Sequence, residues 1–345
     1  MMIIDCHGHY TTGPKELGEY REQQKAELKE NPQVKHLKGE INITDSQLRD
    51  SIEQNQLRLQ KERGTDLTIF SPRASWMGHH IGNIHTSKNW SEHCNDLIYR
   101  IVEMFPENFA GVCQLPQSPG YGMETSAKEL ERCVKELGFI GCNLNPDPSG
   151  GYFNDVPPLD DEYWFPLYEM MCELEVPAMI HVSGSCNPNY HTTSSYYLGG
   201  DTMAFTQLMM SKDLFKRFPK LKFIIPHGGG AVPYHWGRFR GLCDMMGLPN
   251  LNEIIKDHIY FDTCVYHQEG IELLLESVPT ENILFASEMI GAVRGIDPLT
   301  GHYFDDTKKY LDRIDLDEKT KRMLFEENAK VVFPRLQAHI DRSKK

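Results

Sequence analysis

The chain lacks paired cysteines. Nine cysteines are spread singly through 345 residues, and no two of them form a C-x-x-C pair. An odd number of scattered cysteines argues against a disulfide framework and is typical of reduced thiols in the cytoplasm. We therefore expect a fold that is stabilised by its hydrophobic core and not by crosslinks.

The sequence also has no long apolar run and no excess of positive charge, since 36 Lys and Arg residues stand against 49 Asp and Glu residues. The opening MMII is too short for the core of a signal peptide, and no apolar run approaches the length of a membrane span. The formal net charge of −13 argues against nucleic acid or an anionic membrane as the main partner. We expect a soluble, cytoplasmic protein in which local arginines must attract any anionic ligand.

A third missing feature is a G-x-G-x-x-G motif after the first strand, which argues against a doubly wound open sheet. The chain instead alternates short β-rich runs with helical stretches. The eight runs are residues 3–9, 66–73, 109–116, 139–146, 177–183, 222–229, 259–266 and 283–289. Apolar strands separated by helices indicate a parallel sheet covered by helices, and eight of them predict one α/β domain, a (β/α)₈ TIM-like barrel.

The predicted barrel domain spans residues 1–335 and contains an inserted helical segment at about 14–63. Within this insertion, residues 43–64 are predicted to form one amphipathic helix that Thr44 caps and Gly64 ends. Residues 336–345 are assigned to a C-terminal tail, and we expect its DRSKK ending to fray.

The first strand carries the sequence IIDCHGH, with two histidines one residue apart. Side chains at i and i+2 of a strand point to the same face, so His7 and His9 stand side by side with Gly8 between them. Two neutral imidazoles so placed suit a shared cation. This motif alone leaves open an ordinary alternative, in which each histidine is hydrogen-bonded separately.

Polar residues recur at the carboxyl ends of the predicted strands, where (β/α)₈ barrels place their catalytic groups. These residues are His7, His9, Arg73, Asn143, Asn145, His181, His227, Asp262 and Glu288. Three histidines and a carboxylate at one mouth make a plausible N₃O ligand set for a divalent ion, with zinc the first choice. Separate hydrogen bonds would explain any single residue, but they explain the whole set less well.

His227 opens the sequence HGGG. This motif also occurs in oxyanion loops, but the chain has no G-x-S-x-G nucleophile elbow, which argues against serine hydrolysis. We interpret His227 as a general acid or base beside the metal, with a turn histidine as the alternative.

Arg73 and Arg294 lie just beyond strand ends. Their guanidinium groups could bind carboxylates through two parallel hydrogen bonds, although surface salt bridges are the alternative for each. Two such arginines at one mouth suggest a substrate with several carboxylates.

Together these elements resemble the amidohydrolase superfamily, in its branch of metal-dependent decarboxylases and hydratases. The resemblance covers residues 3 to about 335 and rests on stretches such as DLTIFSPRAS, NLNPDPSGG, IPHGGGAVPYHWGRFRG and LFASEMIGAVRGIDP. Binuclear members carry a bridging lysine on strand four, which FIGCNLNP lacks, so one metal ion is expected. Decarboxylases generally end strand eight with aspartate, whereas Glu288 is typical of the hydratases.

The resemblance implies a role for each site residue. His7, His9, His181 and Glu288 would bind one zinc ion, and His227 and Glu288 are the candidate catalytic residues. Arg73, Asn145, Tyr197 and Arg294 would bind the substrate, although Tyr196 could take the place of its neighbour. The implied protein is a homodimer that hydrates an unsaturated keto tricarboxylate from aromatic degradation. A decarboxylase is the first alternative, and a non-catalytic zinc protein is the second.

Overall fold

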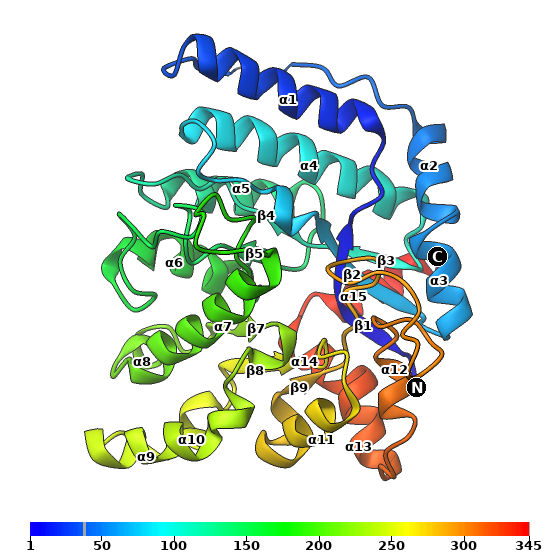
Figure 1. The fold of residues 1–345 in the computed structure, drawn as a ribbon, viewed down its shortest axis with the longest axis vertical. Coiled ribbons are helices and arrows are strands. Elements are labelled where there is room, and N and C mark those ends of the chain that lie inside the picture. Colours follow the sequence, from blue (N-terminus) through cyan, green and yellow to red (C-terminus); the bar gives the residue numbers. More distant parts are fainter. Residues whose placement is uncertain (37–38, 345) are drawn as a thin grey trace.

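The fold is a (β/α)₈ barrel, and the computed structural model describes residues 1–36 and 39–344 (Figure 1). Nine short strands occupy the eight strand positions of the barrel. They are β1 (Ile4–Tyr10), β2 (Leu67–Pro72), β3 (Phe109–Gly111), β4 (Cys113–Gln114), β5 (Cys142–Leu144), β6 (Ala178–Ile180), β7 (Phe223–Ile225), β8 (Ile259–Asp262) and β9 (Ile283–Leu284). The third predicted strand is split at Val112 into β3 and β4. The barrel prediction is confirmed.

All strand pairs are parallel, in the order β1-β2-β3 and β4-β5-β6-β7-β8-β9. Backbone hydrogen bonds also join the halves of the ring. Among them, Val112 N donates to Phe70 O at 2.9 Å, and Cys6 N donates to Phe285 O at 2.9 Å. Because the strands run in parallel, their carboxyl ends meet at one mouth of the barrel.

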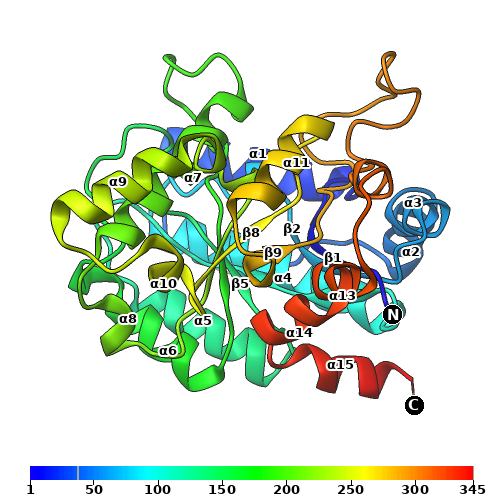
Figure 2. The same ribbon diagram turned by 90° about the horizontal axis from the view of Figure 1, so that it is seen from below.

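Helices surround the strands in Figures 1 and 2. They are α1 (Lys15–Glu30), α2 (Asp45–Glu53), α3 (Gln56–Arg63), α4 (Ile84–Met104), α5 (Glu124–Lys135), α6 (Phe165–Leu174), α7 (Thr193–Met210), α8 (Leu214–Arg217), α9 (Trp236–Met246), α10 (Leu251–Ile255), α11 (Gln268–Ser277), α12 (Lys308–Leu311), α13 (Glu318–Arg322), α14 (Asn328–Val332) and α15 (Leu336–Ser343). Within the described part of the chain, none of these helices is long and apolar enough to cross a membrane.

The helix predicted over residues 43–64 is two helices, α2 and α3. Thr44 caps α2 with a capping box, and Gly64 ends α3 in the left-handed conformation, as expected. The break falls at Asn55, whose backbone is not helical and whose side-chain amide donates to Ser51 O at 2.8 Å. An asparagine that bonds a carbonyl of the preceding turn competes with the helical backbone bonds, which explains the interruption.

The lower end of the barrel is closed by the last helices, α14 and α15, seen at the bottom of Figure 2. Leu336 and Ile340 of α15 are buried against strand residues such as Ile4 and Leu67. Residues 336–345, which we assigned to a tail, are helical through Ser343. Fraying was expected for the DRSKK ending, whose last residue, Lys345, lies outside the described residues.

A register shift in β1 allows the first strand to serve both the core and the mouth. Ile4 and Cys6 face the core of the barrel, and the pairing with β2 shifts between Asp5 and Gly8. Such a bulge changes which side chains point inward. His7 and His9 consequently lie inside the barrel above Cys6, where they meet the histidines of other strands.

Candidate active site

The two histidines of β1 are held in the same way. His7 Nδ1 lies 2.8 Å from Asp262 Oδ2, and His9 Nδ1 lies 2.6 Å from Ser71 Oγ. Both Nε2 atoms face inward and are only 2.9 Å apart. A hydrogen bond at Nδ1 leaves Nε2 with its lone pair, and two lone pairs at this distance repel unless a proton or cation lies between them.

The other two histidines repeat this arrangement. His181 Nδ1 is 2.7 Å from Val182 O, and His227 Nδ1 is 2.9 Å from Asp201 Oδ2. The Nε2 atoms of His181 and His227 are buried and have no hydrogen-bond partner. Since buried polar atoms are normally paired, these two nitrogens are suited to a ligand.

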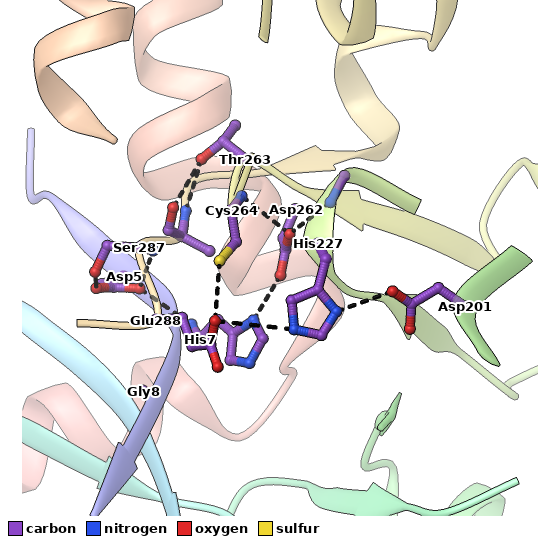
Figure 3. Close-up of polar contacts among 12 residues, drawn as sticks. Asp5, His7, Gly8, Asp201, His227, Asp262, Thr263, Cys264, Ser287 and Glu288 are labelled. Carbon is purple, nitrogen blue, oxygen red and sulfur yellow. Dashed lines mark hydrogen bonds and ion pairs between the residues drawn. The ribbon is translucent and has the colours of Figure 1, made fainter. Parts of the chain in front are cut away.

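Glu288 provides the carboxylate at the same point. Its Oε2 accepts a hydrogen bond from Tyr266 OH at 2.9 Å. The same oxygen contacts Cys264 Sγ at 3.6 Å and lies 3.9 Å from His227 Nε2 (Figure 3). The backbone N of Glu288 donates to His7 O at 2.8 Å, which links the segment after β9 to β1.

The donor atoms fit a divalent cation. One ligand atom each of His7, His181, His227 and Glu288 lies within 4.8 Å of the others, and His9 Nε2 is beside that of His7. Imidazole nitrogens with one carboxylate oxygen suit zinc and other transition-metal ions. The sequence placed His227 beside the ligands, whereas the structure groups it with His7, His181 and Glu288 as a possible ligand.

Burial and neighbouring charges set the protonation of these histidines. Burial, reinforced by the adjacent imidazoles, holds the pKa of His9 and of His181 well below the usual value, so both rings are neutral. Burial also acts to lower the pKa of His227, but Asp201 and two further carboxylates outweigh it and raise that pKa to about 9. The centre therefore combines neutral imidazoles with one that attracts a proton.

A cavity of about 510 Å³ opens above this centre. Its lining includes His9, Arg73, Ser75, Thr193, Tyr197 and Glu288. Arg73 is half-buried, and its Nε donates to Ser75 Oγ at 2.9 Å. The cavity therefore places a cationic side chain next to the candidate metal ligands.

Tyr197, and not Tyr196, belongs to this cavity. Its ring stacks on that of His227, with centroids 5.5 Å apart and an interplanar angle of 14°. Tyr196 is fully buried and donates its hydroxyl hydrogen to Asp147 Oδ2 at 2.7 Å. The hydroxyl of Tyr196 thus has a structural partner, which leaves Tyr197 as the residue that can meet a ligand.

The two remaining predicted substrate residues are placed less favourably. Arg294 is exposed on the loop after β9, where its Nη2 donates to Ile290 O at 3.2 Å. Asn145 is buried, is not among the residues that line the cavity, and accepts a hydrogen bond from Asp147 N at 2.9 Å with its Oδ1. The geometry gives Asn145 a turn-forming role.

Sequence reasoning missed Asp201 and Tyr266, which orient His227 and Glu288 through hydrogen bonds. Asp201 comes from α7, so an inspection limited to strand ends could not find it. Tyr266 follows β8 and has a φ of 60°, and His227 and Glu288 each have a φ of 51°. Non-glycine residues in this left-handed region are strained and often lie at functional sites. Tyr266 shares this backbone conformation with His227 and Glu288.

Comparison with known proteins agrees with this geometry. A family described as amidohydrolase matches residues 4–335. The chain belongs to the amidohydrolase family. It is 60% identical over 340 residues to the 2-keto-4-carboxy-3-hexenedioate hydratase of Sphingobium sp. (strain NBRC 103272 / SYK-6), and the match covers 99% of this chain and 98% of that protein.

Two solved structures extend the likeness. The 4-oxalomesaconate hydratase from Rhodopseudomonas palustris has a TM-score of 0.91 and 53% identity, with 99% of both chains covered. A dihydroxybenzoic acid decarboxylase from Polaromonas sp. JS666, with bound manganese and an inhibitor, has a TM-score of 0.67 and 20% identity, covering 96% of this chain and 97% of that one. At that lower identity, the decarboxylase supports the shared fold alone.

Proposed function

We propose that the protein is a metal-dependent hydratase that interconverts 4-oxalomesaconate and 4-carboxy-4-hydroxy-2-oxoadipate. The observation that carries this proposal is the convergence of four imidazole rings and Glu288 beside a cavity that His9, Glu288 and Arg73 line. The names of the two similar hydratases supply the substrate, an alkene conjugated to a keto group and bearing three carboxylates.

The proposed cofactor is one divalent ion per chain, zinc by its ligand types, held by His7, His9, His181 and Glu288. The hydrogen bonds at Nδ1 of the three histidines support this set, because they orient each Nε2 toward the same point. When bound, such an ion supplies Lewis acidity and makes water nucleophilic at neutral pH.

In this reaction the OH group of water adds to C4 and a proton adds to C3, with the C2 keto group as the electron sink. His227 is the proposed acid or base, because Asp201 fixes its Nδ1 while its Nε2 faces Glu288. Glu288 is oriented by Tyr266 and is the second candidate for proton transfer. Arg73, Arg294 and Tyr197 are proposed to bind the carboxylate and keto groups.

We further propose that the enzyme is a cytoplasmic homodimer that acts in the degradation of aromatic compounds through protocatechuate or gallate. The scattered, unpaired cysteines support a reducing compartment. The dimer follows from the family resemblance. Nucleic acid and membranes are not among the proposed partners, because the chain is strongly acidic.

Incubation with 4-oxalomesaconate tests this function. Hydration destroys the conjugated chromophore, so we expect a loss of ultraviolet absorbance without CO₂ release, and mass spectrometry should find the product of water addition. Release of CO₂ in step with the absorbance loss would instead identify a decarboxylase, and no reaction in the metal-loaded protein would reject the substrate.

A further inference from the structure

Arg73 is a cation without an acidic partner. Among the residues that the structure describes, no carboxylate forms an ion pair with it, and its one hydrogen bond runs from Nε to Ser75 Oγ. Both terminal nitrogens are therefore available to a ligand in the cavity that Arg73 lines. Two free, parallel N–H groups match the oxygens of a carboxylate.

The side chain that holds Arg73 in place is Trp76. The guanidinium carbon of Arg73 lies 4.6 Å from the centroid of the Trp76 ring. A guanidinium over an indole face is attracted by the ring quadrupole without losing its charge. The indole thus restricts the arginine on one side, while Ser75 fixes Nε on another.

Trp76 is itself held by two helices. Its carbonyl oxygen accepts a hydrogen bond from Trp90 Nε1 of α4 at 2.9 Å. On the other side α1 passes close to the indole, since a Cβ atom built at Gly18 would lie 3.6 Å from the ring.

A buried arginine of α1, Arg21, holds the loop that follows Trp76. Its Nη2 donates to Met77 O and Gly78 O, each at 3.2 Å, and its guanidinium carbon is 4.6 Å from the ring of Trp90. Gly78 N donates to Ser183 Oγ at 2.8 Å, which links the loop to the segment after β6. Residues 74–78 are therefore held by contacts with α1, with α4 and with the segment after β6.

We propose that Trp76 is a positioning residue for substrate binding, and that α1 acts through it. The inserted helix holds Trp76, and Trp76 holds the Arg73 guanidinium at the cavity wall, with its terminal nitrogens free of hydrogen bonds to other described residues. This inference rests on the proposed function, in which Arg73 binds a substrate carboxylate. It also gives α1, which the chain inserts between the first two barrel strands, a role in the active site.

The test is a double-mutant cycle with 4-oxalomesaconate as substrate. We expect Trp76→Leu to raise KM about fivefold while kcat stays within about twofold, because a loosened arginine weakens ground-state and transition-state binding alike. Trp76→Phe, which retains an aromatic face, should give a smaller rise. In an Arg73→Met background, Trp76→Leu should change KM no further, since the cation it positions is gone.

Phe165→Leu is the matched control. Phe165 carries a comparable contact with Arg217, at 4.2 Å, but does not line the cavity, so this variant should keep the wild-type KM. Metal content and melting temperature are measured for every variant to exclude loss of the site or fold. If Trp76→Leu does not fold, the KM of Trp76→Phe decides.

Two results would overturn the positioning role: an unchanged KM in Trp76→Leu and Trp76→Phe, or an equal rise in KM with Arg73 and without it. Inactivity of the wild-type enzyme toward 4-oxalomesaconate would reject the proposed function. In that case the contact is followed by the ¹⁵Nε–H NMR signal of Arg73, which should be sharp in wild type and broadened in Trp76→Leu. An identical signal in both proteins would reject the contact itself.

Discussion

His227 is fixed at one nitrogen and free at the other, which is the arrangement expected of a group that transfers a proton. Asp201 bonds its Nδ1, and its Nε2 is buried without a hydrogen-bond partner among the described residues, 3.9 Å from Glu288 Oε2. We expect His227→Asn to retain one metal ion per chain and nearly normal substrate binding, while kcat falls by about 10²–10⁴. Metal analysis and steady-state kinetics check this. Loss of the metal would make His227 a ligand and would place His9, His181 or Glu288 in question.

Arg73 provides the corresponding prediction for binding. Arg73→Met should cost about 2–4 kcal/mol of substrate binding, seen mainly as a higher KM, because a buried charged hydrogen bond to a carboxylate is lost. The metal content should not change. Arg294→Met should have a smaller effect, because Arg294 is exposed and its Nη2 donates to Ile290 O of its own loop. Wild-type kinetics in Arg73→Met would show that this arginine does not contact substrate.

At the scale of elements, the carboxyl ends of the strands bring the site residues together. The caps of the surrounding helices stabilise those helices. Thr44 Oγ1 accepts a hydrogen bond from Gln47 N at 3.2 Å, and Gln47 Oε1 accepts one from Thr44 N at 2.9 Å. Thr44→Ala should therefore lower the free energy of unfolding by about 1 kcal/mol, whereas Thr44→Ser should nearly preserve it. Urea unfolding measures both. Equal stability of the two variants would mean that the capping box does not stabilise α2.

At the scale of the whole molecule, the metal is expected to stabilise the folded barrel. Chelation should abolish activity and lower the melting temperature, and zinc should restore both, because an ion that binds only the folded state shifts the unfolding equilibrium. His7→Ala should fold but lose the metal, the activity and the response to zinc. Metal analysis and thermal unfolding test this. Two tightly bound ions per wild-type chain would contradict the proposed site.

The oligomeric state is a second prediction at this scale. The chain has a mass of 39.7 kDa, so the proposed homodimer should have twice that mass in light scattering coupled to size exclusion. The mass should remain concentration-independent in the micromolar range. A stable monomer with full activity would reject the dimer and would show that one barrel suffices for the reaction.

The sequence by itself determined the features that depend on local patterns. Apolar runs that alternate with helical stretches predicted the barrel strands. Because parallel strands bring their carboxyl ends together, the positions of His7, His9, His181 and Glu288 at these ends predicted that they lie close to one another. Thr44 and Gly64 gave the outer limits of a helical segment for the same local reason. The metal assignment and the hydratase activity remain predictions that this placement supports.

Only the tertiary structure decided the contacts between elements that are distant in the chain. Asp201 reaches His227 from a helix, and Trp76 supports Arg73 only because α1 and α4 pack around their loop. Asn145, which follows a strand as the predicted ligands do, instead forms a turn with Asp147. A strand end specifies where a side chain begins, whereas its direction and partners depend on how the surrounding helices pack, and no local pattern encodes that packing.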